Sequence, residues 1–140
     1  MAENLVRFGI SMERQLLDRF DAVVQRKGYH TRSEAVRDLV RSSLVEAAWQ
    51  TPDADVVGTV TLVYDHHQRG LCEHLTNLQH GHHQLVRATT HMHLDTANCL
   101  EVIVVKGPAA QVQHLADELI SSRGVKHGRL VATTTGVDLG

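Results

Sequence analysis

The first residues of the chain alternate between apolar and polar side chains. Positions 6–11 read Val-Arg-Phe-Gly-Ile-Ser, so the apolar side chains project to one face and Arg7, Gly9 and Ser11 to the other. A period of two predicts a strand with one buried face. Because one short strand leaves its backbone donors and acceptors without partners, we expect it to pair with the same strand of a second copy.

Two amphipathic helices are predicted behind this strand. Apolar residues recur at spacings of three and four over about residues 12–26, and Gly28 suits the left-handed cap of that helix. A Thr-x-x-Glu capping box at Thr31 and Glu34 predicts the start of a second helix, whose apolar positions continue to Val45.

A polar stretch with a proline at residues 50–55 interrupts the helical pattern, because proline cannot continue a helix. We place a domain boundary there, with one domain over 1–50 and a second over 51–140. Two domains of this size are expected to need a partner copy.

The second domain shows four strand-like and two helix-like segments. Strands are predicted over 56–64, 85–94, 100–106 and about 127–134, and helices over 71–79 and 108–124. The order β-α-β-β-α-β is that of a ferredoxin-like fold, one antiparallel sheet with two helices on one face, and the ACT type of this fold pairs to build ligand sites. The expected fold class is therefore α+β.

Composition and charge narrow the possible partners. Residues 1–50 hold eight Lys and Arg against seven Asp and Glu, and residues 51–140 hold six against nine, so no basic patch indicates nucleic acid. No stretch approaches the roughly 18 consecutive apolar residues of a membrane span, and the opening residues lack a secretion signal. We expect a cytoplasmic protein without a membrane partner, in which a reducing compartment leaves Cys99 free and Cys72 is a small buried hydrophobe.

Two histidines on one predicted strand indicate a metal site. His91 and His93 project the same way, and a tight turn at residues 95–98 can bring Cys99 beside them. Two imidazoles and a thiolate are nitrogen and sulfur ligands for a transition metal. Glu101 shares the strand face of Cys99 and is expected to orient a ligand imidazole without touching the metal.

The N-terminal pattern resembles the ribbon-helix-helix family of repressors, on Gly28 and the run 32–37 at the head of the second helix. The resemblance implies a two-stranded ribbon in the DNA major groove. It implies that Arg7, Gly9 and Ser11 face base edges, while Ser33 and the free amides of the second helix hold a phosphate. Two alternatives stay open, namely that Arg7 is a solvated strand residue and that Ser11 is the N-cap of the first helix.

Over nearly its whole length the sequence resembles the NikR family of nickel-responsive transcriptional regulators. The residues that carry this resemblance are Gly28-Tyr29, Arg32-Ser33-Glu34-Ala35, Arg37-Asp38, Tyr64, Gln79-His80, His82-His83, His91, His93, Cys99-Leu100-Glu101, Lys106-Gly107, Val112-Gln113-His114 and Arg123-Gly124-Val125. The resemblance implies a homotetramer, a dimer of dimers, that binds double-stranded operator DNA and represses nickel uptake.

The same resemblance implies the ligand set. One Ni²⁺ per subunit lies in a square plane formed by His91, His93 and Cys99 of one subunit and His80 of a neighbour, a geometry that suits Ni²⁺ or Cu²⁺, whereas Zn²⁺ prefers a tetrahedron. Glu34 and Asp38, with carbonyls of residues 120–125, are candidates for a second cation, or else a solvated acidic face.

Several histidines and two other functions stay open. His82 and His83 belong to a solvated loop or to a secondary metal site, while His66, which precedes His67 and lies near Tyr64, is a candidate for an alternative site in this family. A nickel or copper carrier without specific DNA binding is the main alternative, and an ACT-type small-molecule sensor is another. A metalloenzyme is disfavoured, because a site with four protein ligands leaves no open position for a substrate.

Overall fold

The structure is a computed structural model of the 140-residue chain, and residues 4–140 are described. The chain forms two compact units, Met1–Val40 and Arg41–Gly140. The division lies within the second helix, α2 (Arg32–Trp49), whereas the sequence places the boundary at residue 50. The domain limits 1–50 and 51–140 stay a prediction.

The first helix, α1 (Arg14–Lys27), ends at the glycine expected to cap it. Gly28 has φ 82°, a left-handed conformation that costs little without a side chain. Its N–H donates to the Gln25 carbonyl at 3.1 Å, and the Tyr29 N–H donates to the Val24 carbonyl at 3.1 Å. These bonds satisfy carbonyls at the helix end, and the predicted cap is confirmed.

The helix α2 begins with the predicted capping box. The Thr31 hydroxyl accepts the Glu34 N–H at 3.1 Å, and the Glu34 carboxylate accepts the His30 N–H at 3.1 Å. Two of the free backbone N–H groups around the helix start are thereby satisfied. Next to this cap the Tyr29 hydroxyl donates to Asp38 at 2.6 Å, so a tyrosine fixes the acidic side chain one turn further on.

Residues 4–13 form no strand among the described part of the chain. The apolar side chains of Val6, Phe8 and Ile10 are 78%, 73% and 62% exposed, as expected where a strand lacks the copy with which it would pair. The helix α1 starts at Arg14, two residues later than predicted, and its N-cap is Glu13. The alternative that Ser11 caps this helix is therefore wrong.

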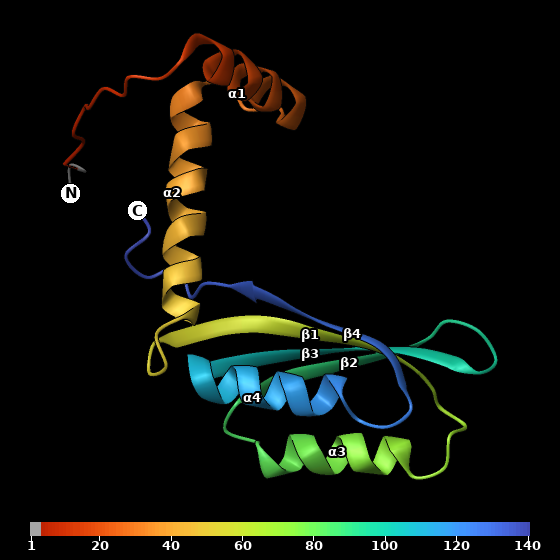
Figure 1. Cartoon of the computed structure of the whole chain (residues 1–140). Coiled ribbons are helices and arrows are strands. Elements are labelled where there is room, and N and C mark those ends of the chain that lie inside the picture. Colours follow the sequence, from red (N-terminus) through yellow and green to blue (C-terminus); the bar gives the residue numbers. More distant parts are fainter. Residues whose placement is uncertain (1–3) are drawn as a thin grey trace. The chain divides into compact units, whose positions relative to one another are not determined.

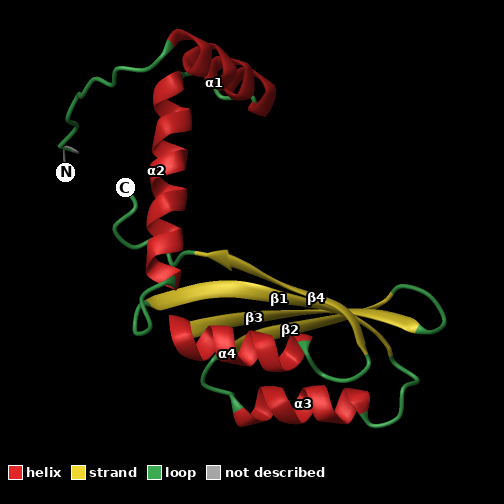
Figure 2. Ribbon diagram, in the orientation of Figure 1, coloured by secondary structure: helices red, strands yellow, loops and turns green. Residues whose placement is uncertain are grey.

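The second unit contains a four-stranded antiparallel sheet and two helices packed on one of its faces (Figure 1, Figure 2). In chain order its elements are β1 (Asp55–Asp65), α3 (Leu71–Gly81), β2 (Val86–His93), β3 (Asn98–Pro108), α4 (Ala109–Ile120) and β4 (Val125–Thr133). The strands lie in the order β2-β3-β1-β4. The predicted element order is confirmed, with shifts of one or a few residues at most element ends.

The core lies between the sheet and its two helices. Alternate residues of β1 and β3 are buried, as the period of two requires when one sheet face is covered. The helices contribute apolar side chains spaced three or four apart, and burial of each large side chain is worth about 1.5–3 kcal/mol. The central members are Val60, Leu62, Ile103, Leu75, Leu115 and Leu119.

Within the second unit, Trp49 ties the last turn of α2 to the sheet. Its indole N–H donates to the Thr133 carbonyl at 2.9 Å, and the side chain is 8% exposed. A Cβ atom on Gly58 would lie 3.2 Å from the Trp49 ring and 2.8 Å from the Val131 carbonyl oxygen. Glycine is required there because the indole and the neighbouring strand both approach the backbone closely.

The opposite face of the sheet is the one that α3 and α4 do not cover. Its side chains alternate with the buried ones, and many are apolar yet partly or largely exposed: Val57, Val63, Met92, Leu100, Val102, Val104 and Val131. None of the helices formed by residues 4–140 has both the length and the apolar content needed to cross a bilayer.

Candidate metal site

Strand register brings the candidate ligands to one end of the sheet. On β2 and β3, His91 lies opposite Glu101 and His93 opposite Cys99. On the other side of β3, Tyr64 of β1 lies opposite Cys99. Since neighbouring strands are about 5 Å apart, these side chains lie within contact distance.

The turn between β2 and β3 is fixed by one aspartate. The Asp95 carboxylate accepts the N–H groups of Ala97 and Asn98 at 2.8 and 2.7 Å, and the Asn98 side-chain amide at 3.0 Å. These hydrogen bonds favour the ionised form, and they lower the pKa of Asp95 to about 2. The turn therefore holds Cys99 beside the histidine strand, as the sequence predicts.

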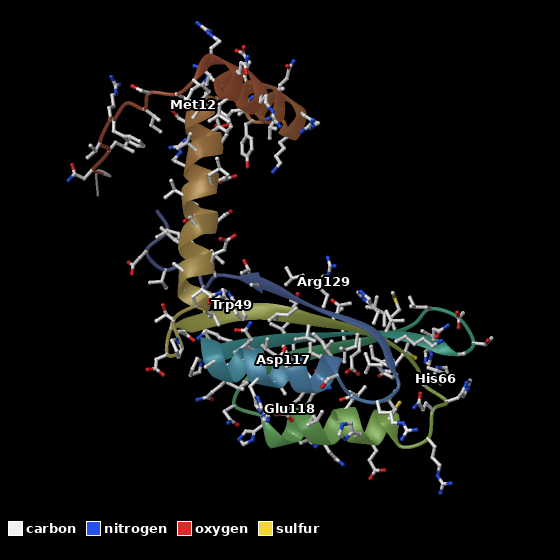
Figure 3. All side chains as sticks on the ribbon, viewed as in Figure 1. Met12, Trp49, His66, Asp117, Glu118 and Arg129 are labelled. Atoms are coloured by element: carbon white, nitrogen blue, oxygen red, sulfur yellow. The ribbon has the colours of Figure 1, made fainter. Side chains whose placement is uncertain are left out.

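Two imidazole nitrogens lie beside the Cys99 sulfur and form with it a group of three donor atoms. The Sγ atom lies 3.2 Å from Nδ1 of His66 and 3.5 Å from Nδ1 of His93, and all three donors lie within 4.8 Å of one another. Figure 3 shows His66 in the loop after β1. Its backbone N–H donates to the Ala97 carbonyl at 3.0 Å, which ties this loop to the β2–β3 turn.

The Cys99 thiol is buried, whereas the imidazoles beside it reach the surface. Burial raises the pKa of Cys99, and the nearby Cys72 thiol and Asp65 carboxylate raise it further, because each disfavours a second negative charge. A cation that binds the sulfur must displace its proton. Metal binding at this site is therefore expected to strengthen as pH rises.

His91 has different neighbours from His93. Its Nδ1 atom lies 3.5 Å from the Glu101 carboxylate and 3.5 Å from the Tyr64 hydroxyl, which itself donates to Glu101 at 3.2 Å. Glu101 is only 6% exposed, and its other oxygen accepts the Gln79 side-chain amide at 3.0 Å. The pKa of Tyr64 is raised by burial and then by the Glu101 charge, which keeps the hydroxyl a donor.

The structure brings together some of the predicted ligands within one chain. His93 and Cys99 lie with His66, while His91 lies beside them with its ring centre 5.6 Å from that of His93. His80 lies exposed in the last turn of α3, outside this donor group as formed by residues 4–140. The predicted set of His80, His91, His93 and Cys99 stays a prediction.

Two residues near the donor group differ from the expectations drawn from the sequence. His66 was expected only as a candidate for an alternative metal site, and Cys72 was expected to be buried. His66 follows Tyr64 by two residues, so the same period of two that predicts β1 could have placed it next to Cys99. Cys72 is exposed, and the prediction that it is buried is wrong, since Leu71 and Leu75 occupy the buried face of α3. Its thiol donates to the His66 carbonyl at 3.9 Å.

The remaining candidate residues are solvated or paired. His82 approaches the Glu118 carboxylate at 3.9 Å, and His83 is exposed. Arg7, Gly9, Ser11 and Ser33 are exposed in the first unit. Glu34 and Asp38 accept the hydrogen bonds described above, so both have partners within the first unit.

Comparison with known proteins identifies the chain. The family model described as the NikR C terminal nickel binding domain matches residues 57–133. A putative nickel-responsive regulator of Geobacter sulfurreducens is 56% identical over 134 residues, which cover 96% of each chain. A putative nickel-responsive regulator of Solibacter usitatus is 55% identical over 96% of this chain and 97% of its own length. The one of Nitratidesulfovibrio vulgaris strain DP4 is 52% identical over 96% of each chain.

The fold and the donor set define an α+β metal-binding protein with a helical N-terminal unit. The comparisons make the class a metal-responsive regulator rather than an enzyme. The chain belongs to the NikR family of nickel-responsive regulators, and the resemblance seen in the sequence is confirmed. Its imidazole and thiol donors fit nickel, which accepts nitrogen and sulfur ligands.

Proposed function

We propose that the protein is a nickel-responsive DNA-binding transcriptional regulator that represses nickel-uptake genes when Ni²⁺ is bound. The observation that carries this proposal is the buried Cys99 thiol with imidazoles gathered around it, in a chain of the NikR family. A thiol with two imidazole nitrogens within 4.8 Å of it is a set of nitrogen and sulfur donors that suits a transition metal.

The proposed nickel ligands are His91, His93 and Cys99 of one subunit and His80 of the partner subunit, with one Ni²⁺ per subunit. Glu101 supports this assignment, because its carboxylate faces Nδ1 of His91 and thereby leaves Nε2 for a cation. The exposed position of His80 at the end of α3 is compatible with a bond to a second copy. Ni²⁺ held by these side chains would link two subunits through the nitrogen and sulfur donors that it accepts.

Hydrogen bonds connect Glu101 with α3. They offer a route by which nickel binding at His91 affects His80, the residue proposed to bind the nickel of the partner subunit. Gln79 bonds to Glu101 at 3.0 Å and accepts the Thr89 hydroxyl at 2.7 Å, and it immediately precedes His80. We infer that ligation at His80 orders residues 80–85 and favours one arrangement of the tetramer. Nickel and DNA then strengthen each other's binding by equal factors.

The proposed quaternary structure is a dimer of dimers. Residues 6–11 of two copies pair as a ribbon-helix-helix strand pair, which covers the exposed side chains of Val6, Phe8 and Ile10. The second domain is proposed to be ferredoxin-like and of the ACT type, and its helix-free sheet face provides apolar surface for tetramer formation.

The proposed DNA contacts come from the ribbon and from the start of α2. Arg7, Gly9 and Ser11 face base edges, and Ser33 with the first amides of α2 holds a backbone phosphate. A second cation is proposed at Glu34 and Asp38.

A mobility-shift experiment tests this function. The purified protein is mixed with DNA from its candidate promoters in the presence of nickel, zinc, copper or chelator, and the titration is repeated for Cys99→Ala. We expect salt-dependent binding that requires nickel and disappears in the variant. A nickel or copper carrier would instead bind the metal equally well but leave the DNA unshifted under every condition.

A further inference from the structure

The start of α2 is tied to α1 by an ion pair whose residues take no part in the metal site. Arg32, the first residue of α2, donates from Nε and from one terminal nitrogen to the two carboxylate oxygens of Asp21, at 2.7 and 2.8 Å. In this parallel two-bond arrangement a guanidinium and a carboxylate fix each other's orientation as well as their distance. The pair therefore helps to set how the first turn of α2 is oriented with respect to α1.

The other side-chain contacts of this turn are local. The capping box and the hydrogen bond from the Tyr29 hydroxyl to Asp38 lie within residues 29–38, so they shape the turn itself. The Asp21–Arg32 pair instead links the turn to the middle of α1. It is therefore suited to controlling where the first residues of α2 point.

This orientation matters for the proposed DNA contact. Ser33, which follows Arg32, and the first amides of α2 are proposed to hold a backbone phosphate. An arginine beside such a contact is ordinarily expected to bind phosphate itself. Here two of its nitrogens are already bonded to Asp21, at distances typical of strong hydrogen bonds between charged groups. The guanidinium is thus directed to α1.

Stability alone does not explain the pair. The side chains of Arg32 and Asp21 are 60% and 39% exposed, and ion pairs with that much exposure contribute little to the free energy of unfolding. Asp21 also places a negative charge close to the proposed phosphate contact, which by electrostatics alone weakens DNA binding. A better orientation of the α2 amides would offset this repulsion.

We propose that Asp21 and Arg32 are positioning residues for DNA binding, which hold the first turn of α2 on α1 so that Ser33 and the first amides of α2 meet a phosphate. Neither side chain of the pair contacts the DNA. The inference rests on the proposed function and deepens it, because it names residues that make the DNA contact possible. It also fixes the sign of an effect, since removing the acidic charge of Asp21 should weaken DNA binding rather than strengthen it.

Mobility-shift titrations of five full-length proteins in the presence of nickel test the proposal. The proteins are the wild type, Asp21→Asn, Arg32→Lys, the double variant with both changes, and Asp18→Asn, and the probe is the promoter fragment that the wild type shifts. Asp18→Asn is the matched control, because it removes the same charge from an exposed residue of the same helix. Nickel affinity and the urea midpoint of each protein are measured as well. A residue that only stabilises the fold would change the midpoint and leave the DNA affinity of the folded protein unchanged.

We expect Asp21→Asn to weaken DNA binding by at least about tenfold, since the loss of a hydrogen bond to a charged phosphate costs about that factor. Arg32→Lys keeps the charge but cannot form two parallel bonds, so it should weaken binding too, and it keeps the test in place if Asp21→Asn folds poorly. The double variant should bind no more weakly than Asp21→Asn, because both changes break the same pair. Nickel affinity should stay at the wild-type level throughout, and Asp18→Asn should bind DNA at least as tightly as the wild type.

Three other outcomes would overturn the proposal. Tighter DNA binding by Asp21→Asn, with a steeper dependence on salt, would show that the released Arg32 binds phosphate itself. DNA binding equal to that of Asp18→Asn would show an ordinary surface ion pair, and additive losses in the double variant would show that the two residues act separately. If the wild type shifts no promoter fragment with nickel, the proposed function fails together with this inference. A wild-type shift that Asp21→Asn and Arg32→Lys retain at full strength rejects the inference alone.

Discussion

The Gln79 side chain donates a 3.0 Å hydrogen bond to Glu101, which fixes the residue before His80 to the strand that carries Cys99. The Glu101 carboxylate also receives the Tyr64 hydroxyl and faces His91. One buried carboxylate thus connects a proposed nickel ligand of this chain with the segment that is proposed to supply a ligand to the partner. Hydrogen bonds from Tyr64 and Gln79 hold this carboxylate in place.

The first prediction concerns Glu101→Gln. The amide keeps the volume of the carboxylate but loses its charge, so it orients the His91 imidazole less strongly and makes it a weaker donor to a metal. We expect nickel affinity to fall about 10-fold to 100-fold while the fold is retained. Competitive nickel titration and circular dichroism measure the two effects. The control is Glu118→Gln, which changes a partly exposed carboxylate on α4 that pairs with His114, and it should leave nickel affinity unchanged.

The second prediction concerns Gly58→Ala. The added methyl group meets the Val131 carbonyl and the Trp49 ring, neither of which can move far because the Trp49 indole is hydrogen-bonded to β4. We expect a loss of about 1–3 kcal/mol in the free energy of unfolding, the usual cost of overpacking. Urea unfolding followed by the fluorescence of Trp49, the single tryptophan, reports it. Gly81→Ala, where nothing lies within 4 Å of the new Cβ atom, should leave the midpoint nearly unchanged.

Local patterns predicted most of the helices and strands of both units. The period of two in β1 and β3, the helical spacing in α3 and α4, and the glycine and capping box between α1 and α2 depend on neighbours in sequence. The predicted element order and the placement of Glu101 on the face of Cys99 agree with the structure for the same reason.

The donor group of the metal site was harder to predict, because it depends on contacts between distant segments. His66 reaches Cys99 only through the register of β1 with β3, and 33 residues separate the two. Cys72 is exposed because Leu71 and Leu75 occupy the buried face of α3, and Cys72, which follows Leu71 directly, lies off that face. The strand expected at residues 6–11 needs a second copy, so one chain does not form it.

The third prediction concerns Asp95→Asn and its dependence on pH. The folded-state pKa of about 2 lies below the ordinary value of 3.8, so the Asp95 hydrogen bonds add stability above pH about 4 and lose it as pH falls toward 2. We expect the variant to be less stable than the wild type at pH 6 and the difference to vanish near pH 2. Thermal unfolding of both proteins across this range measures it. A difference that stayed constant with pH would show that the carboxylate charge is not responsible.

The fourth prediction concerns the origin of the histidine that completes the nickel site. His80→Ala keeps His91, His93 and Cys99, and Cys99→Ala keeps His80, so each variant alone lacks one ligand in every site. When the two are unfolded, mixed in equal amounts and refolded, a pair of unlike subunits contains one complete site. Random pairing about a two-fold axis should restore about a quarter of the wild-type nickel absorption. If His80 belonged to the same chain as the other ligands, no mixture would regain any, and the measured absorption would stay at the level of the separate variants.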